Sequence, residues 1–357
     1  MTSRPDPAPQ LHDPRWRAFA SDNYAGMLPE VVAALVAANG GHQPSYGDDV
    51  YTEQLRSVVR SEFGTRADVF PVFNGTAANV VSLTAMLPRW GAAIVAESAH
   101  VHNDEGGAPE RVSGIKLLTV PTVDGKLTPD SIATQAYGFG DVHRAQPLAV
   151  SLTQSTELGT LYSVDEIASI CEYSHRHGML VHVDGARLWN AAEALGLSLG
   201  EFTTAAGVDV VSLGGTKIGA LGAEAVVVID PDAVSGTDYI RKLSMQLSSK
   251  MRFVSAQLLA LFDGDTALQA AANANAMAAR LRGHLEGTPG LTITQPTQAN
   301  AVFAVLDPAV AERVLAVWKF YTWDESTGEV RWMCSFDTTA EDVDEFAAAI
   351  KAELTAG

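Results

Sequence analysis

The sequence predicts an α/β fold, namely a doubly wound, mainly parallel sheet followed by a smaller C-terminal α+β domain. Short Val-rich runs alternate with helical patterns between residues 30 and 250, which is typical of parallel strands joined by helices. The runs at 208–213 and 225–229 are apolar throughout and bounded by Gly, as expected for strands buried on both faces. Beyond residue 250, helical patterns, one strand and a hairpin indicate a separate α+β unit.

The length of the chain predicts more than one domain. At 357 residues it is long for one ordinary core, so we expect one large and one small domain. The Pro-rich, polar start predicts a mobile arm over residues 1–18. The large domain is then expected at 19–250 and the small domain at 251–357.

Capping residues and periodicity predict the elements of the large domain. Pro29 suits the first turn of a helix that continues through 31–38, and an apolar stripe from Leu55 to Phe63 predicts the next helix. The other elements expected here are strands at 69–73, from Ile94, at 148–152 and at 180–183, and helices at 80–87, from Thr128 and from Ser163 to His177.

The C-terminal part is expected to contain mostly helices. The patterns predict helices at 237–262, 266–285, 309–317 and 343–354, a strand at 301–306, and a hairpin at 320–336 that turns near Gly328.

Charge and hydropathy exclude several classes of partner. The net charge is −18 and no Lys/Arg cluster forms a basic stripe, so we expect neither nucleic acid nor an anionic membrane as partner. No apolar run approaches the roughly 18 residues of a membrane span, and the N-terminus has no apolar signal segment. Cys171 and Cys334 lack the spacing of a disulfide framework or a metal site, so no metal is expected. These observations favour a cytoplasmic protein that acts on a small molecule.

A single cation stands in the glycine-rich connection between the strands at 208–213 and 225–229. This residue, Lys217, has four glycines around it. A lysine drawn into a closed pocket has a lowered pKa because it is desolvated, and its amine becomes a nucleophile toward carbonyls. Lys217 is therefore either a Schiff-base lysine or a solvated lysine in a flexible loop, and the choice depends on the other candidate residues.

A second candidate site is the start of the helix after the strand at 69–73. Gly75 and Thr76 lie there, where free N–H groups and the positive end of the helix point at one spot that suits a phosphate. The alternative is that Thr76 or Asn74 only caps the helix. Both interpretations are open at this point.

Two more strands end in polar residues. The strand from Ile94 is followed by two His and two carboxylates, beginning with His100. A His at this end of a strand lies where ligands gather. The alternative is a structural role, which is more common for an isolated His. The strand at 180–183 ends in Asp184, with Arg187 three residues further on. Asp184 either faces the same mouth of the sheet or caps the next helix and pairs with Arg187. Arg331 is an unusual cation in an otherwise apolar hairpin strand.

Together these residues suit pyridoxal phosphate. Its phosphate needs a helix N-terminus, its ring a stacking partner such as His100, its pyridine nitrogen an acid such as Asp184, and its aldehyde a lysine such as Lys217. No single part is specific, but their order along an α/β chain favours this cofactor. A dinucleotide-dependent dehydrogenase is not expected, because no Gly-x-Gly-x-x-Gly opens the first helix.

After residue 18 the chain resembles the low-specificity L-threonine aldolases, which are pyridoxal phosphate enzymes of fold type I in the aromatic amino acid beta-eliminating lyase superfamily. The motifs that carry the resemblance are Phe19-Ala-Ser-Asp-Asn, Tyr46-Gly-Asp-Asp, Asn74-Gly-Thr-Ala-Ala-Asn, Glu97-Ser-Ala-His, His182-Val-Asp-Gly-Ala-Arg and Ser212-Leu-Gly-Gly-Thr-Lys. The last two, in this order, are the most specific.

The resemblance implies cleavage of L-threonine, L-allo-threonine and related β-hydroxy-α-amino acids to glycine and an aldehyde. It makes Lys217 the Schiff-base residue, Asp184 the partner of the pyridine nitrogen and His100 the residue stacked on the ring. Gly75 and Thr76 become phosphate ligands.

The resemblance also implies a substrate clamp and an assembly. Ser21, Arg187 and Arg331 are expected to bind the substrate carboxylate, with Arg331 contributed by the small domain. Tyr46 and Arg252 are expected near the cofactor phosphate across a subunit boundary, in a homotetramer built from close dimers.

One departure from the family pattern concerns the general base. The family often has Thr-His-Asn-Gly where this chain has Thr156-Glu-Leu-Gly, so Glu157 replaces the His. We hypothesise that His100, or a water that it holds, takes the proton of the β-hydroxyl, with Glu157 as the competing base. The alternative function is a pyridoxal phosphate lyase for another β-hydroxy amino acid, such as phenylserine, or one that acts by β-elimination. A cofactor-binding relative without activity is a further alternative.

Overall fold

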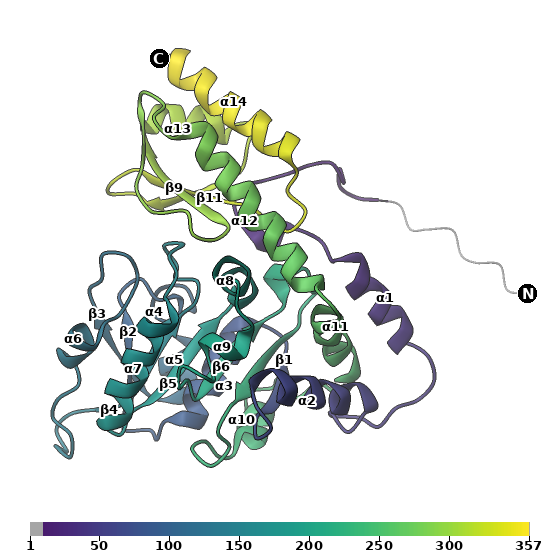
Figure 1. The fold of residues 1–357 in the computed structure, drawn as a ribbon, viewed down its shortest axis with the longest axis vertical. Helices are drawn as coiled ribbons and strands as arrows, with labels where there is room; N and C mark the ends of the chain where they lie inside the picture. Colours follow the sequence, from purple (N-terminus) through teal and green to yellow (C-terminus); the bar gives the residue numbers. More distant parts are fainter. Residues whose placement is uncertain (1–9, 357) are drawn as a thin grey trace, which may run out of the picture.

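The structure, a computed structural model, describes residues 10–356, so residues 1–9 of the predicted N-terminal arm lie outside this range. It contains a seven-stranded sheet and a four-stranded sheet, each beside its own hydrophobic core. Figure 1 shows the smaller unit above the larger one, with the long helix α12 (Thr266–Leu285) running between them.

The large sheet has the strand order β1-β7-β6-β5-β4-β2-β3. Neighbouring strands from β6 to β3 are parallel, and β7 runs antiparallel to both of its neighbours. The predicted mainly parallel sheet is thus confirmed. Its strands are β1 (Asp68–Val72), β2 (Gly91–Ala96), β3 (Lys116–Val120), β4 (Gln146–Thr153), β5 (Leu180–Gly185), β6 (Val210–Gly214) and β7 (Glu224–Val228).

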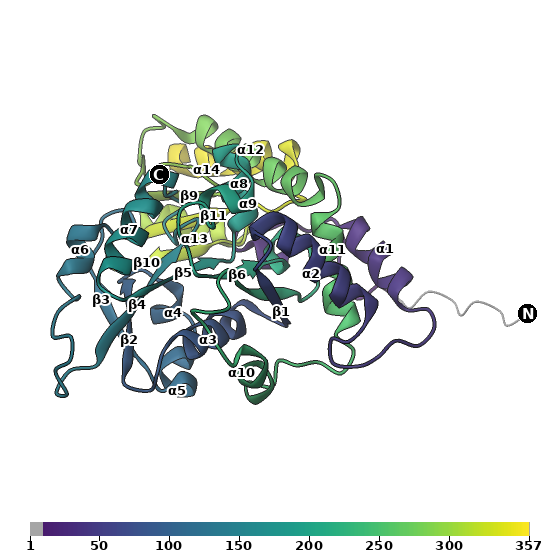
Figure 2. The same cartoon turned by 60° about the horizontal axis from the view of Figure 1, so that its bottom comes forward.

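Helices cover both faces of this sheet, as predicted for a doubly wound fold. Figure 2 shows α3, α5 and α10 below the sheet and α7, α8 and α9 above it. Helix α11 packs against both α1 and α2, and α2 and α11 contact β1. The helices of this part are α1 (Pro29–Ala38), α2 (Val50–Phe63), α3 (Gly75–Met86), α4 (His100–Asn103), α5 (Ala108–Ser113), α6 (Pro129–Ala133), α7 (Val164–Arg176), α8 (Leu188–Leu195), α9 (Leu199–Phe202), α10 (Thr237–Leu243) and α11 (Arg252–Phe262), with short 3-10 helices η1 (Asp22–Tyr24) and η2 (Thr216–Ile218).

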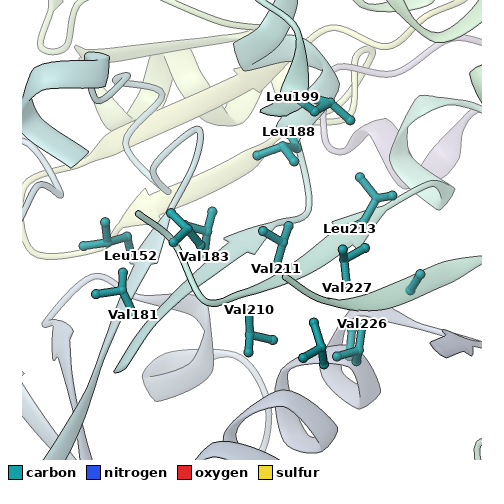
Figure 3. Packing of buried hydrophobic residues seen from close by; sticks show 14 of the residues in the cluster. Leu152, Val181, Val183, Leu188, Leu199, Val210, Val211, Leu213, Val226 and Val227 are labelled. Atoms are coloured by element: carbon teal, nitrogen blue, oxygen red, sulfur yellow. The ribbon is translucent and has the colours of Figure 1, made fainter. Parts of the chain in front are cut away.

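Apolar side chains on both faces of the central strands form the larger core. Figure 3 shows Val210 and Val226 on one face of β6 and β7, and Val211 and Val227 on the other. All four side chains are fully buried. This burial on both faces explains the continuous apolar runs from which the two strands are predicted.

The small domain has an antiparallel sheet in the order β10-β11-β9-β8. Its elements are β8 (Leu291–Ile293), β9 (Ala301–Leu306), α13 (Pro308–Leu315), β10 (Tyr321–Asp324), β11 (Glu329–Met333) and α14 (Ala340–Ala356). The ring of Phe19 stacks on that of Phe346, with 4.1 Å between centroids. The N-terminal segment is therefore tied to the small domain.

The two cores divide the chain differently from the expected domains. Helix α11 packs with α1 and α2 in the larger core, which extends through Ala271, and the smaller core resumes at Ala278. Phe19 belongs to the smaller core. The two cores therefore separate within α12, and the domain boundary expected at residue 250 stays a prediction. An amphipathic pattern shows that a helix has an apolar face, but it does not show which of two cores that face joins.

One predicted element is wrong. The helix expected from Thr237 to Phe262 is two helices, α10 and α11. Met245 lies between them with a φ of 61°, which a continuous α-helix does not allow.

Among the helices described, none combines the length and the apolar composition that crossing a bilayer requires.

Candidate active site

A cavity of about 620 Å³ opens between the carboxyl ends of the parallel strands and the β10–β11 hairpin of the small domain. The large-domain residues come from six separate segments of chain, and folding brings them to one edge of the sheet. Nine of the predicted site residues line it: Ser21, Gly75, Thr76, His100, Glu157, Asp184, Arg187, Lys217 and Arg331.

Lys217 lies on η2, in the connection between β6 and β7. Its loop is tight, because a Cβ on Gly215 would lie 2.3 Å from the carbonyl oxygen of Ala223 and Gly219 has a φ of 110°. Burial lowers the pKa of the Lys217 amine, and the charge of Arg187 lowers it further. The enclosed, nucleophilic form of this lysine is thus the one that the structure favours over a solvated surface lysine.

Glu224, on β7, holds the loop that carries Lys217. Its two carboxylate oxygens accept the backbone N–H groups of Gly215 and Thr216, each at 3.2 Å. Burial raises the pKa of Glu224 to about 7, because these bonds and the nearby Lys217 charge offset only part of the cost of desolvation. This residue was not singled out from the sequence, since a lone Glu in an apolar strand has no distinctive pattern.

Asp184 stands at the end of β5 with only 4% of its surface exposed. Its Oδ2 accepts the side-chain N–H of Asn79 at 2.7 Å, and its Oδ1 accepts the N–H of Ala186 at 3.1 Å. It does not pair with Arg187, whose partner is a different carboxylate. The alternative of a surface pair between Asp184 and Arg187 is therefore wrong.

The start of α3 offers unused donors to the cavity. Asn74 caps this helix, because its side chain accepts the N–H of Ala77 at 2.8 Å. Within residues 10–356, the N–H groups of Gly75 and Thr76 have no acceptor, and a Cβ on Gly75 would meet no atom within 4 Å. Capping by Asn74 therefore leaves the first two N–H groups of the helix without an acceptor, and their role as an anion site stays a prediction.

His100 and Glu157 lie side by side at the cavity wall. The N–H of His100 donates to Oε1 of Glu157 at 2.8 Å. The other oxygen of Glu157 is shut off from solvent and has no partner among the described residues. Burial raises the pKa of Glu157, which is the direction expected for a carboxyl group that exchanges protons near neutral pH.

Arg187 is held by Asp22, which is 2% exposed. Its Nε and Nη2 donate to the two oxygens of Asp22 at 2.7 and 3.0 Å, and Asn300 donates to the same carboxylate at 3.1 Å. Ser21, beside Asp22, lines the cavity and accepts the N–H of Asn23 at 3.2 Å. One edge of Arg187 is thus occupied within the protein.

Arg331 faces the cavity from β11. Its guanidinium carbon lies 4.6 Å from the ring centroid of Trp323 and 5.8 Å from that of Tyr321. Its Nε is buried and has no partner among the described residues. Burial and the charge of Arg187 lower the pKa of Arg331 to about 10, which still leaves it cationic at neutral pH.

Two predicted site residues do not line the cavity. Tyr46 has a φ of 63°, is half exposed, and its N–H donates to Ser249. Arg252 contacts the carbonyl of Gly41 at 3.4 Å. Both lie where the 41–49 loop meets the start of α11, so their predicted role across a subunit boundary stays a prediction.

Several residues that line the cavity or bond to its side chains were not singled out from the sequence. Asp22, Asn79 and Glu105 lie within or beside the quoted motifs, but their contacts are long-range and only folding reveals them. Asn300 carries no sequence signal at all. Among the described residues, no group of three or more His, Cys, Asp or Glu side chains is placed to hold a metal ion.

The fold and the cavity define a class: an α/β enzyme of two domains with an enclosed lysine between two core strands. A model of the beta-eliminating lyases matches residues 18–309, and the chain belongs to this family.

Three comparisons place the chain further. It is 43% identical to a low specificity L-threonine aldolase of Pseudomonas aeruginosa over 335 residues, which cover 93% of this chain and 96% of that one. A second Pseudomonas enzyme of the same name is 42% identical over 95% and 98% of the two chains. The solved threonine aldolase of Leishmania major superimposes with a TM-score of 0.88 at 25% identity, over 94% and 99% of the chains. The resemblance found in the sequence and the predicted fold class are thereby confirmed.

Proposed function

We propose that this protein is a low-specificity L-threonine aldolase that uses pyridoxal 5′-phosphate. It cleaves the Cα–Cβ bond of L-threonine, L-allo-threonine and related β-hydroxy-α-amino acids, giving glycine and an aldehyde. The observation that carries the proposal is the identity of 43% to a relative of that name over nearly the whole of both chains. An enclosed amine, a buried acid and two arginines in one cavity supply the chemistry that the reaction needs.

The residues of the cavity fit the cofactor. Its aldehyde suits the nucleophilic amine of Lys217, its pyridine nitrogen the carboxylate of Asp184, and its phosphate the free N–H groups of Gly75 and Thr76. His100 is half exposed beside them and is the candidate to stack on the ring. When bound, the cofactor supplies an electron sink for the pair of electrons left on Cα.

The substrate carboxylate is assigned to Arg331, Ser21 and Arg187. Arg331 lines the cavity and has no carboxylate partner among the described residues, whereas Asp22 occupies the Nε and Nη2 edge of Arg187. Arg331 therefore makes the principal charge-assisted bond, and Arg187 contributes its positive charge and its remaining nitrogen. A fixed carboxylate determines which Cα bond is oriented for cleavage.

Two groups are candidates for accepting the β-hydroxyl proton. His100 engages Glu105 through Nδ1, so Nε2 is the nitrogen available to the cavity. One oxygen of Glu157 has no partner among the residues that the structure describes, and burial raises the pKa of this carboxyl group. We assign the role to His100, directly or through a water. Turnover within a few-fold of wild type in His100→Phe, together with loss of turnover in Glu157→Gln, would reverse the assignment.

The experiment that tests the function is aldehyde release from four stereoisomers of threonine. Purified protein with pyridoxal phosphate is given L-threonine, L-allo-threonine or either D enantiomer, and a coupled dehydrogenase reduces the aldehyde. Aldehyde from the L forms, with an equal amount of glycine, is expected. Aldehyde from none of the four would refute the proposal.

A second candidate substrate class has one observation in its favour. Tyr321, Trp323 and His100 line the cavity, and such rings suit an aromatic substituent on Cβ. Phenylserine would then be cleaved to benzaldehyde and glycine, and pyruvate from serine would instead reveal β-elimination. Comparing the products from phenylserine and serine with those from threonine separates these activities.

Assembly as a homotetramer of close dimers completes the proposal. Tyr46, Leu243 and Met245 are half or more exposed apolar side chains around the loop that Tyr46 and Arg252 share, which suits an interface with another copy. A cytoplasmic location is supported by Cys171 and Cys334, which are buried and unpaired.

A further inference from the structure

A buried carboxylate connects two site residues that come from different parts of the chain. Glu105 follows α4, its side chain is fully shielded from solvent, and it was not assigned a role from the sequence. Its Oε1 lies 2.9 Å from Nδ1 of His100 and accepts the side-chain N–H of Asn79 at 2.8 Å. The same Asn79 nitrogen donates to Asp184 at 2.7 Å. One chain of three hydrogen bonds therefore runs from His100 to Asp184.

The bonding pattern determines which atoms carry protons. Both hydrogens of the Asn79 amide are used, one by each carboxylate, so neither carboxylate needs a proton of its own for these bonds. Glu105 then accepts from Nδ1 of His100, which makes Nδ1 the protonated nitrogen of the neutral ring and leaves Nε2 with a free lone pair. A ring without this partner could adopt either tautomer.

A purely structural role accounts poorly for this arrangement. Among the described residues, the second oxygen of Glu105 and the amide oxygen of Asn79 are buried without a partner. Burying such groups costs stability, and an apolar pair of the same size would avoid that cost. Groups that are retained at a cost beside a cavity are more readily explained by what they do to the site.

We propose that Glu105 is a positioning residue that, together with Asn79, sets the orientation and the tautomer of His100 and couples its proton affinity to Asp184. The inference deepens the proposed aldolase function and rests on it for the role of His100 as a base. With Nδ1–H fixed on Glu105, Nε2 is the nitrogen that can take the β-hydroxyl proton.

The charges around His100 agree with this role. The bond to Glu105 is the largest influence and raises the pKa of His100, while burial opposes it. The charge of Asp184 also raises this pKa and that of Lys217 lowers it. Other charged groups that line the same cavity are Asp104, Glu157, Arg187 and Arg331.

The decisive measurement is a histidine titration by NMR of the holoenzyme labelled with ¹⁵N-histidine, with His100 assigned by its absence in His100→Phe. In wild type we expect the Nδ1–H tautomer for the neutral ring. Glu105→Gln should move the titration midpoint to lower pH and allow the Nε2–H tautomer. Asn79→Ala should move the midpoint to higher pH, because Glu105 and Asp184 lose the amide donor that they share and so attract the His100 proton more strongly. The Nδ1–H tautomer should be kept.

Kinetics give a second readout. Because the base must be neutral, the rising limb of kcat against pH should follow the His100 midpoint in each variant, and Glu105→Gln should lose about tenfold or more in kcat. Glu110→Gln removes an exposed carboxylate from the neighbouring helix α5 and should stay within about twofold of wild type.

Each outcome is decisive. Opposite shifts of the midpoint in the two variants support the proposal, and unchanged midpoint and tautomer overturn it even if both variants are less stable. If Glu105→Gln does not fold, the sign of the shift in Asn79→Ala decides. If no threonine isomer is cleaved, the proposed function fails, whereas the NMR titration still tests the positioning of His100 by itself.

Discussion

Asp22 and Arg187 form a two-point ion pair, with Nε and Nη2 of the arginine donating to both oxygens of the carboxylate at 2.7 and 3.0 Å. The pair joins residues 165 positions apart in the sequence. Burial raises the pKa of Asp22, but the charges of Arg187 and Lys217 and the hydrogen bonds outweigh it and hold the pKa below its ordinary value. Asp22 thus determines which edge of the Arg187 guanidinium remains available in the cavity.

Asp22→Asn should destabilise the protein by about 3 kcal/mol, because it leaves a largely buried guanidinium without its counter-charge. Urea unfolding at pH 7 measures this. The pKa of Asp22 is lower in the folded than in the unfolded protein. The ion pair therefore stabilises the fold fully above the ordinary pKa of an aspartate, and this stabilisation is lost as the pH falls through the lowered value. Asp344→Asn is the control, as it breaks an exposed pair with Arg280 and should change stability little.

Arg331→Lys should lower kcat/KM for L-threonine by about tenfold or more, since a lysine replaces a bidentate donor with a point charge. Most of the effect is expected in KM, which steady-state kinetics separate from kcat. Arg313→Lys alters an exposed pair with Glu353 and serves as the matched control. An unchanged KM in Arg331→Lys would exclude this arginine from the carboxylate site.

Lys217→Met should stabilise the protein without cofactor, by about 0.5–2 kcal/mol at neutral pH. The pKa of Lys217 is lowered by burial and by Arg187, so the unfolded chain binds the proton more tightly and the stability of wild type should rise with pH toward 10.5, the ordinary lysine pKa. Thermal unfolding of both proteins at several pH values measures the difference. A less stable variant with an unchanged pH dependence would contradict the enclosed, destabilised state of this amine.

His182 should make folding sensitive to mild acid. It is completely buried, between the hydroxyls of Ser151 at 2.8 Å and Ser212 at 2.9 Å, and burial lowers its pKa from 6.5 to about 4. The unfolded state takes up a proton first, so stability should decrease by up to about 3 kcal/mol as the pH falls from 6.5 to 4. His182→Asn should reduce this slope. His143→Asn, which replaces an exposed imidazole, serves as the matched control.

Much of the fold and most of the catalytic candidates could be predicted from local pattern. The Val-rich runs of β6 and β7 are apolar because both faces of these strands are covered, and the polar residues that follow β5 and β6 must lie at one edge of a parallel sheet. Asp184, Lys217 and Arg187 are predictable for this reason, since each lies within a few residues of a strand end.

The partners of these residues are decided by tertiary structure. Nothing near Arg187 in the sequence indicates that Asp22 holds it, or that Asn79 joins Asp184 to Glu105, because these contacts form only when distant segments pack. The break between α10 and α11 and the burial of Phe19 in the small domain are likewise results of packing.

By itself the sequence determined the order of strands and helices and the chemical groups at the sheet edge, since periodicity and residue type are local. Only the tertiary structure decided which group bonds to which, and hence the protonation and orientation of each, because long-range proximity sets the dielectric and the charges that surround it.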